Sequence, residues 1–112
     1  MLKGHLDAIV LAALEAGPAH GYAIIEAIKK RSASTFDLPE GTVYPALHRL
    51  EQAGWLASSW TTPPGGRRRR VYSLTKTGAA ALAARRKAWG RFAEAVDASL
   101  GVRLGGGRTW PA

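Results

Sequence analysis

The stretch GTVYPALHRLEQA, Gly41–Ala53, predicts a helix with one apolar face. Pro45 interrupts the helical pattern, but proline is tolerated in a first helical turn, where the missing N–H would have no partner. We therefore expect the helix to begin near Gly41 or Thr42, with Thr42 as its N-cap. Three apolar residues recur at spacings of four and three, which places them on one side of this helix: Val43, Leu47 and Leu50.

A Pro/Gly-rich connector lies between two short strand-like segments downstream of this helix. Gly54 ends the helix, and the segments Trp55–Trp60 and Arg69–Leu74 then predict a β-hairpin with a long loop. Because an isolated two-stranded hairpin is marginally stable in water, it must pack against the helices. Alternation along the strands turns three side chains inward: Leu56, Tyr72 and Leu74.

Two further helices are expected before this stretch. One runs from about Gly4 to Glu15 and is ended by Gly17 and Pro18; the other spans His20–Lys30. The inward residues expected on the first helix are Leu6, Ile9, Val10, Ala13 and Leu14. Those expected on the second are Tyr22, Ile25 and Ile28.

A long helix is expected after the hairpin. It begins at Thr75, reaches about Leu100 and is closed by Gly101, and the glycine-rich residues 102–112 that follow are expected to form a mobile tail. The fold class is therefore mainly α with a small β-hairpin: a winged helix-turn-helix followed by a long C-terminal helix. The expected division is a winged helix-turn-helix at 1–74, a single long helix at 75–101 and a flexible tail at 102–112.

Composition narrows the class of partner. The 112 residues carry a formal net charge of +8, which favours an anionic polymer as partner, and the lack of cysteine excludes disulfides and thiolate chemistry. The longest apolar run, Ala8–Leu14, is far shorter than the roughly 20 residues that span a bilayer. No secretory signal is recognisable, so a cytoplasmic location is expected.

The chain resembles the PadR family of bacterial transcriptional regulators over about residues 2–100. The resemblance rests on GTVYPALHRLE at Gly41–Glu51, on Gly54-Trp55-Leu56, Trp60, Gly66-Arg67 and YSLTKTG at residues 72–78, and on Leu11–Leu14 and His20-Gly21-Tyr22. It implies a homodimer that binds an inverted-repeat operator, usually as a repressor, and that dimerises through the C-terminal helix. It also implies that some members respond to aromatic small molecules. In having a single helix after the hairpin, the chain resembles the short subfamily of this family.

The outward face of the helix at Gly41–Ala53 is the expected DNA reader. Its side chains can reach phosphates or base edges, since Arg pairs with guanine and Gln with adenine. Tyr44 has an alternative role, as a packing buttress. An ordinary solvated helix face is the alternative for the whole set: Thr42, Tyr44, Pro45, His48, Arg49 and Gln52.

The hairpin tip carries four consecutive arginines, which we expect to hold phosphate or enter a narrow minor groove. Alternation aims Arg67 and Arg69 one way and Arg68 and Arg70 the other, so that two or three of them meet one duplex. A solvated loop is the alternative. Near the start of the second helix, Gly21 is expected to permit a close approach, either of another helix or of the DNA backbone. The remaining two candidates for phosphate contact are His20 and Tyr22, the latter with a core position as its alternative.

The last helix carries an apolar seam with a period of seven, which suits helix–helix association. The seam comprises Leu82, Trp89 and Val96, with Phe92 and Leu100 nearby. Packing against the protein's own first helix is the alternative, and both can hold at once. Paired Trp89 rings across a dimer axis would form either a plain dimer core or a slot for an aromatic ligand.

No catalytic, cofactor or metal site is expected, because the three histidines lie on separate elements and no Gly-rich phosphate loop is present. Two other functions remain as alternatives. One is a non-specific basic nucleic-acid-binding protein. The other is a protein-interaction winged helix, anchored by Trp55, Trp60 or Trp110.

Overall fold

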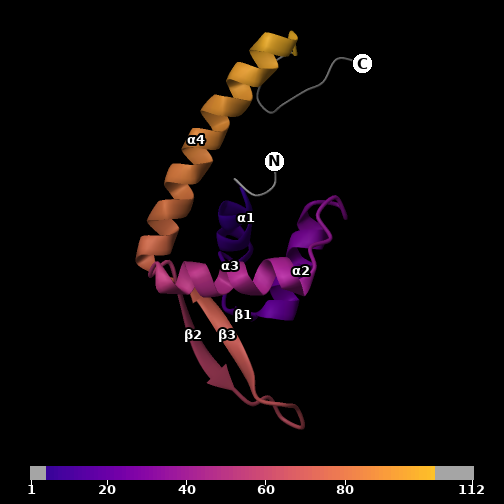
Figure 1. Ribbon diagram of the computed structural model, residues 1–112, viewed down its shortest axis with the longest axis vertical. Helices are drawn as coiled ribbons and strands as arrows, with labels where there is room; N and C mark the ends of the chain where they lie inside the picture. The colour runs from indigo at the N-terminus through magenta and orange to yellow at the C-terminus, as the bar shows by residue number, and fades with distance from the viewer. Residues whose placement is uncertain (1–4, 103–112) are drawn as a thin grey trace. The chain divides into compact units, whose positions relative to one another are not determined.

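The computed structural model describes residues 5–102 and contains the predicted helices and hairpin (Figure 1). The elements in chain order are α1 (Leu6–Ala13), β1 (Ala19–His20), α2 (Gly21–Arg31), α3 (Glu40–Gln52), β2 (Leu56–Thr61), β3 (Arg69–Leu74) and α4 (Lys76–Leu100). Two compact units are present, and they divide within α4 between Leu82 and Ala83. The tail predicted at 102–112 lies outside the described residues apart from Val102.

One hydrophobic core holds α1, α2, α3, the sheet and the first turns of α4 together. Its fully buried large side chains come from all of these elements: Val10, Leu11, Ile24, Val43, Leu47, Leu50, Leu56 and Leu82. The periodicity of α1 correctly placed Leu6, Val10 and Leu14 inside, but Ile9 and Ala13 are only partly buried and the buried Leu11 was missed.

The start of α3 differs from the prediction by one or two residues. The helix begins at Glu40, its N-cap position is occupied by Pro39, and no side chain caps it, so the prediction of Thr42 as N-cap is wrong. Pro45 consequently lies in the second turn, where an ordinary residue would donate its N–H to the Gly41 carbonyl. The helix therefore gives up one internal hydrogen bond at its exposed N-terminal end.

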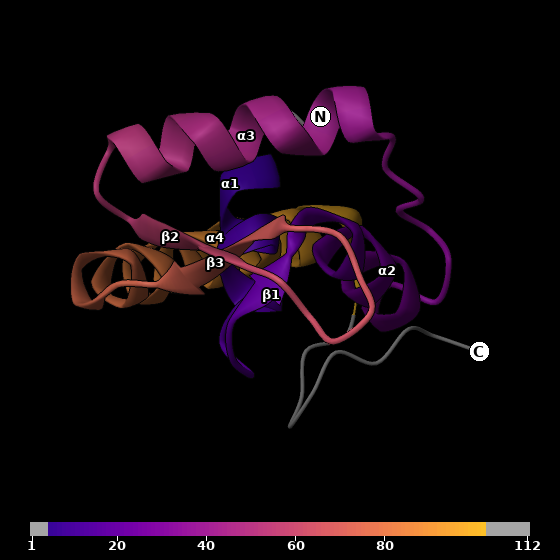
Figure 2. The same cartoon turned by 90° about the horizontal axis from the view of Figure 1, so that it is seen from below.

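The hairpin is part of a three-stranded antiparallel sheet with the order β1-β3-β2. The short strand β1 was not predicted; it pairs Ala19 with Tyr72 and His20 with Val71. Figure 2 shows α3 on the β2 side of the hairpin, and β1 with α2 on its β3 side. Leu56 and Tyr72 are buried as predicted, whereas Leu74 is partly buried.

A tight junction joins α3, β2 and α4. Gly54 follows α3 with a φ of +83°, a left-handed conformation that suits glycine and ends the helix as predicted. The Thr75 hydroxyl donates to the Gly54 carbonyl at 2.7 Å and accepts the N–H of Gly78 at 2.9 Å, so Thr75 caps α4. The Thr75 N–H donates to the Trp55 carbonyl at 3.2 Å. These bonds fix where α4 begins.

Candidate nucleic-acid interface

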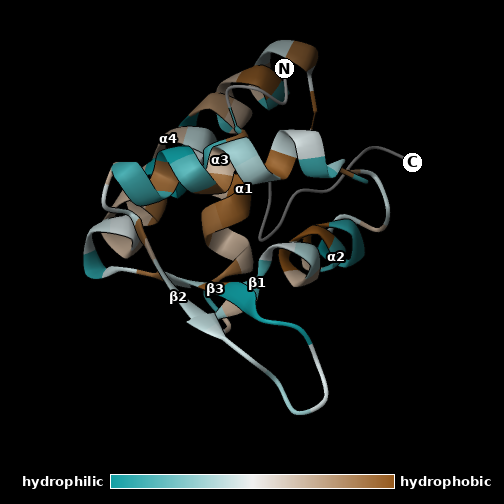
Figure 3. Cartoon of the chain, turned by 60° about the horizontal axis from the view of Figure 1, so that its bottom comes forward, coloured by the Kyte–Doolittle hydropathy of each residue, from teal (hydrophilic) through white to brown (hydrophobic). Residues whose placement is uncertain are grey.

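The predicted reading face of α3 is exposed in the structure. Val43, Ala46, Leu47 and Leu50 are buried, as an amphipathic helix requires. The predicted contact residues lie on the other side, with Thr42 partly exposed and the rest exposed: Tyr44, Pro45, His48, Arg49 and Gln52. Figure 3 shows hydrophilic residues along α3 and where the hairpin loop enters β3. The described geometry thus offers a polar helix face to a partner.

Tyr44 packs against the start of α2. A Cβ added at Gly21 would lie within 2.6 Å of the Tyr44 ring carbon Cε1 and hydroxyl oxygen, so only glycine allows this approach. The close approach predicted for Gly21 is therefore present, and its partner is Tyr44. Tyr44 as a whole residue is 40% exposed. Tyr44 is thus a buttress between α2 and α3 that remains partly accessible to solvent.

Arg49 is already engaged within the chain. Its Nη2 lies 2.6 Å from the Asp7 carboxylate of α1, and 57% of the Arg49 side chain is exposed. An exposed ion pair of this kind contributes less than about 1 kcal/mol, so a phosphate or base can compete for the guanidinium. Asp7 therefore restrains Arg49, a restraint that sequence spacing did not reveal because the two residues lie 42 positions apart.

The wing, defined here as β2, β3 and the loop at residues 62–68, carries the four arginines in exposed positions. Both Arg68 and Arg70 contact the Trp60 ring, with their guanidinium carbons 4.5 Å and 5.4 Å from its centroid. The pair therefore shares one side of the wing, as alternation predicted for Arg68 and Arg70. Trp60, which is 51% exposed, is flanked by positive charge.

Arg70 also makes contacts toward α3. Its Nε donates to the Ser58 hydroxyl at 2.8 Å, and its Nη2 lies 3.3 Å from Glu51. The pKa of the Glu51 carboxyl is lowered, first because the Ser58 hydroxyl donates to it at 2.6 Å and then because of Arg70; partial burial opposes the shift. No site role was predicted for Glu51 or Ser58. Strand pairing of Ser58 with Tyr72 could have placed Ser58 on the inner face.

His20 and Tyr22 take different positions at the start of α2. His20 is the N-cap: its Nδ1 accepts the N–H of Ala23 at 3.3 Å. Its pKa is lowered, first by burial and then by the positive charge of Arg69. Tyr22 is 59% exposed, so the expectation that it points inward is wrong and it remains a surface candidate.

The apolar seam predicted on the last helix is mostly exposed, with one exception. Leu82 is 2% exposed and belongs to the core of the unit that ends there, which corrects its assignment to an association surface. The Trp89 and Phe92 rings lie 5.7 Å apart. Four large apolar side chains stand exposed on this part of α4: Trp89, Phe92, Val96 and Leu100.

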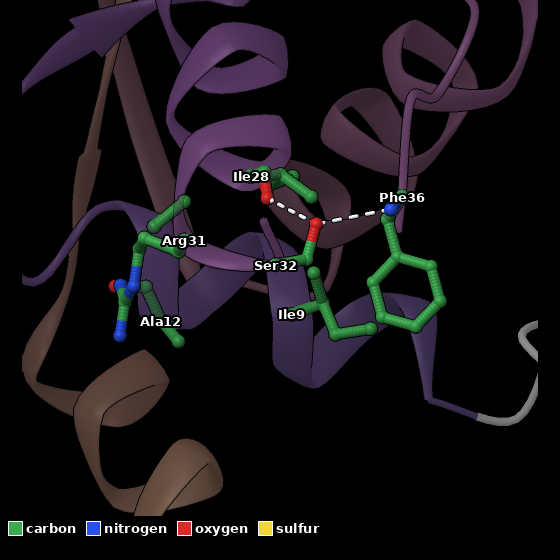
Figure 4. Close-up of a pocket in the computed structure, with 7 residues that line it drawn as sticks. Ile9, Ala12, Ile28, Arg31, Ser32 and Phe36 are labelled. Carbon is green, nitrogen blue, oxygen red and sulfur yellow. Dashed lines mark hydrogen bonds between the residues drawn. The ribbon is translucent and has the colours of Figure 1, made fainter. Parts of the chain in front are cut away.

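An apolar hollow of about 190 Å³ lies between α1 and the end of α2 (Figure 4). Its lining comprises Ile9, Ala12, Ala13, Ile28, Arg31, Ser32 and Phe36. Arg31 donates to the Ala12 carbonyl at 2.8 Å, and Ser32 bridges the Ile28 carbonyl and the Phe36 N–H. Across residues 5–102 there is no group of three or more side chains suited to hold a metal ion. Within the same residues, no helix combines the length and apolarity that crossing a membrane requires.

Comparisons with known proteins assign the chain to a family. Residues 10–84 match the model of the transcriptional regulator PadR-like family. A transcriptional regulator of Mycobacterium tuberculosis is 48% identical over 56 residues, which cover 50% of this chain and 51% of that protein.

Solved structures of similar proteins support the same family assignment. A PadR family transcription regulator from Clostridium difficile is 33% identical with a TM-score of 0.72, over 87% of this chain and 98% of that one. A transcriptional regulator from Clostridium thermocellum has a TM-score of 0.79 at 26% identity, over 86% and 90% of the two chains. The matching family consists of transcriptional regulators and not of enzymes. The chain therefore belongs to the PadR-like family of transcriptional regulators.

Proposed function

We propose that this protein is a sequence-specific DNA-binding repressor that acts as a homodimer on an inverted repeat. The observation that carries the proposal is the exposed polar face of α3 beside a basic wing, two surfaces joined by the Glu51–Arg70 ion pair. The α3 face supplies groups that pair with base edges, and the wing supplies charges for phosphate. Residues 1–74 are the proposed DNA-binding domain, and the proposed location is the cytoplasm.

The contacts proposed for the two surfaces differ. On α3, His48, Arg49 and Gln52 face the major groove, with the positive end of the helix dipole toward phosphate. On the wing, Arg67, Arg68 and Arg69 meet flanking phosphates, while His20 and Tyr22 contribute near the start of α2.

The helix at 75–101 is the proposed dimerisation element. Trp89, Phe92, Val96 and Leu100 are all exposed and recur at spacings of three and four, and an exposed apolar helix face of this kind marks a protein–protein contact. Two copies joined along this face would carry two reading helices, which fits half-sites about 10 bp apart. Replacing Trp89 and Phe92 by glutamate should yield a monomer in sedimentation analysis, and an unchanged dimer would refute this assignment.

An aromatic or hydrophobic small molecule is the proposed effector. The tilted pair Trp89–Phe92 supports a stacking site for a planar ring. Calorimetric titration of planar aromatic ligands into the wild type and Trp89→Leu tests this. Loss of binding in the variant supports a ring-stacking site, while equal binding places any effector elsewhere, for example in the hollow beside Phe36.

Competition binding tests the DNA proposal as a whole. DNA upstream of this protein's own gene is compared with random duplex at two salt concentrations, and a preference of about a thousandfold or more is expected of a specific regulator. A variant with Arg67, Arg68 and Arg69 changed to serine should weaken both DNAs and reduce the salt slope by about 0.9 for each phosphate that is no longer neutralised. A control variant removes three exposed charges elsewhere: Lys30, Lys76 and Lys87.

The alternatives give different results. Equal binding to both DNAs would indicate a non-specific coating protein. No binding to either DNA would indicate a winged helix that contacts a protein partner. Equal decreases in affinity for the arginine variant and for the lysine control would mean that net charge, and not the wing, governs affinity.

A further inference from the structure

Three side chains from three elements form a closed cluster between α3 and the wing. The Ser58 hydroxyl of β2 donates to Glu51 of α3 at 2.6 Å and accepts from Arg70 Nε of β3 at 2.8 Å. Arg70 Nη2 then reaches both Glu51 carboxylate oxygens, at 3.3 Å and 3.4 Å. Each member touches the other two, so the cluster ties the end of α3 to both strands of the hairpin.

The cluster lies where the wing leaves the core. On the inner face of β2 the alternate residues are Leu56, Ser58 and Trp60, and their exposure rises from 2% at Leu56 to 51% at Trp60. Trp60 is paired with Arg70 across the strands. Beyond this pair, within residues 5–102, no hydrogen bond or ion pair ties the wing to α3. The cluster is therefore the outermost attachment that can set the angle of the wing.

Arg70 differs from its neighbours in how fully its guanidinium is used. Two of its nitrogens donate within the cluster, and its planar group also lies over the Trp60 ring. Arg68, by comparison, contacts the Trp60 ring without joining the cluster. To bind phosphate, Arg70 would have to leave Ser58 and Glu51, and this would leave the partly buried carboxylate of Glu51 without its cation.

We propose that Arg70, Glu51 and Ser58 act as a positioning unit that fixes the wing relative to α3, and that this unit determines how strongly the protein discriminates its operator from other DNA. Arg70 is then not a phosphate ligand, unlike Arg67, Arg68 and Arg69. The inference rests on the proposed function, because it requires a preferred DNA. A loosened wing still meets phosphate anywhere on DNA but no longer holds α3 and the flanking backbone contacts in one register.

The test measures dissociation constants for upstream DNA and random duplex at two salt concentrations. Arg70→Gln and Glu51→Gln should each reduce the ratio of the two constants by at least about threefold, the scale of coupling within a hydrogen-bonded network. In both variants the salt slope of DNA binding should stay at its wild-type value, without the decrease of about 0.9 that the loss of one phosphate contact causes. Arg68→Gln is the control for a phosphate ligand, and Glu26→Gln is the control for removal of one exposed acid.

A charge reversal separates positioning from phosphate binding. The double variant Glu51→Arg/Arg70→Glu should recover a larger preference than Arg70→Glu alone, because the ion pair is restored with its ends exchanged. The inference would be overturned if Arg70→Gln reduced the affinity for both DNAs equally and lowered the salt slope as much as Arg68→Gln does. Circular dichroism confirms that each variant folds.

The failure of the inference can be told from the failure of the proposed function. A wild-type chain with no preference for upstream DNA refutes both. A wild-type chain with a strong preference that Arg70→Gln and Glu51→Gln retain refutes the positioning role alone.

Discussion

Replacing Gly78 by alanine perturbs the junction at which α3, β2 and α4 meet. A Cβ at this position would overlap the Trp55 carbonyl oxygen and lie 2.9 Å from both the Trp55 carbonyl carbon and the Leu74 Cδ1. The carbonyl cannot simply retreat, because it accepts the Thr75 N–H. The peptide N–H of Trp55 is also held, by the Leu50 carbonyl at 3.0 Å. The backbone is thus fixed on both sides of the collision.

Three free-energy contributions decide whether Gly78→Ala stabilises or destabilises the protein. Alanine is favoured over glycine within a helix by about 1 kcal/mol. Overpacking costs about 1–3 kcal/mol, and weakening the Thr75 hydrogen bond costs about 1 kcal/mol more. Gly78→Ala should therefore lower the free energy of unfolding by about 1–3 kcal/mol, and each kcal/mol corresponds to about 4–8 °C in Tm for a domain of this size.

Urea unfolding followed by circular dichroism at one protein concentration measures this difference. Gly41→Ala is the matched control, since Gly41 also lies in a first helical turn but has no atom within 4 Å of the added Cβ. The control should be neutral or stabilising by up to about 1 kcal/mol. A Gly78→Ala protein as stable as wild type would refute the argument from the Trp55 carbonyl.

Single contacts elsewhere in the chain give three more expected outcomes. His20→Asn should keep the cap on Ala23, because an asparagine side chain also accepts the N–H. The pKa of His20 is lowered in the folded protein, so as pH falls below 6.5 the unfolded chain takes up the histidine proton more readily than the folded chain does, and wild type loses stability. Urea midpoints measured between about pH 7.5 and 5.5 should therefore fall less in His20→Asn than in wild type. Asp7→Asn should release Arg49 and tighten DNA binding in fluorescence anisotropy, while lowering stability by less than about 1 kcal/mol; unchanged affinity would contradict a restraining role. Gly90→Ala should raise the thermal midpoint by a few degrees, since the added methyl meets nothing within 4 Å, and a fall would reveal a close helix partner.

The sequence correctly predicted features that depend on residues close together in the chain. The apolar spacing of α3 placed Val43, Leu47 and Leu50 inside, and Gly54 ended the helix with a positive φ. The start of α3 was misplaced because Pro45 was assumed to need a first-turn position. In the structure it occupies the second turn, and the helix does without one hydrogen bond.

The missed features depend on contacts between distant residues. Strand β1 has two residues, too few to show alternation, and exists because β3 lies beside it. The pairing of Arg49 with Asp7 and of Arg70 with Glu51 joins residues 42 and 19 positions apart. Sequence alone therefore identified the basic residues of the candidate interface but could not show which of them are already paired.

Strand β1 has a consequence for how the protein can adapt to DNA. β1 continues directly into α2 and is paired with the middle of β3. A rotation of the base of the wing would therefore also displace the start of α2. With β1 and the Arg70–Glu51–Ser58 unit both in place, the flexible part of the wing is the loop at residues 62–68, which no strand pairing restrains. The length of that loop is consequently where evolution or an engineer could change the reach of the protein along a duplex without rebuilding its reading helix.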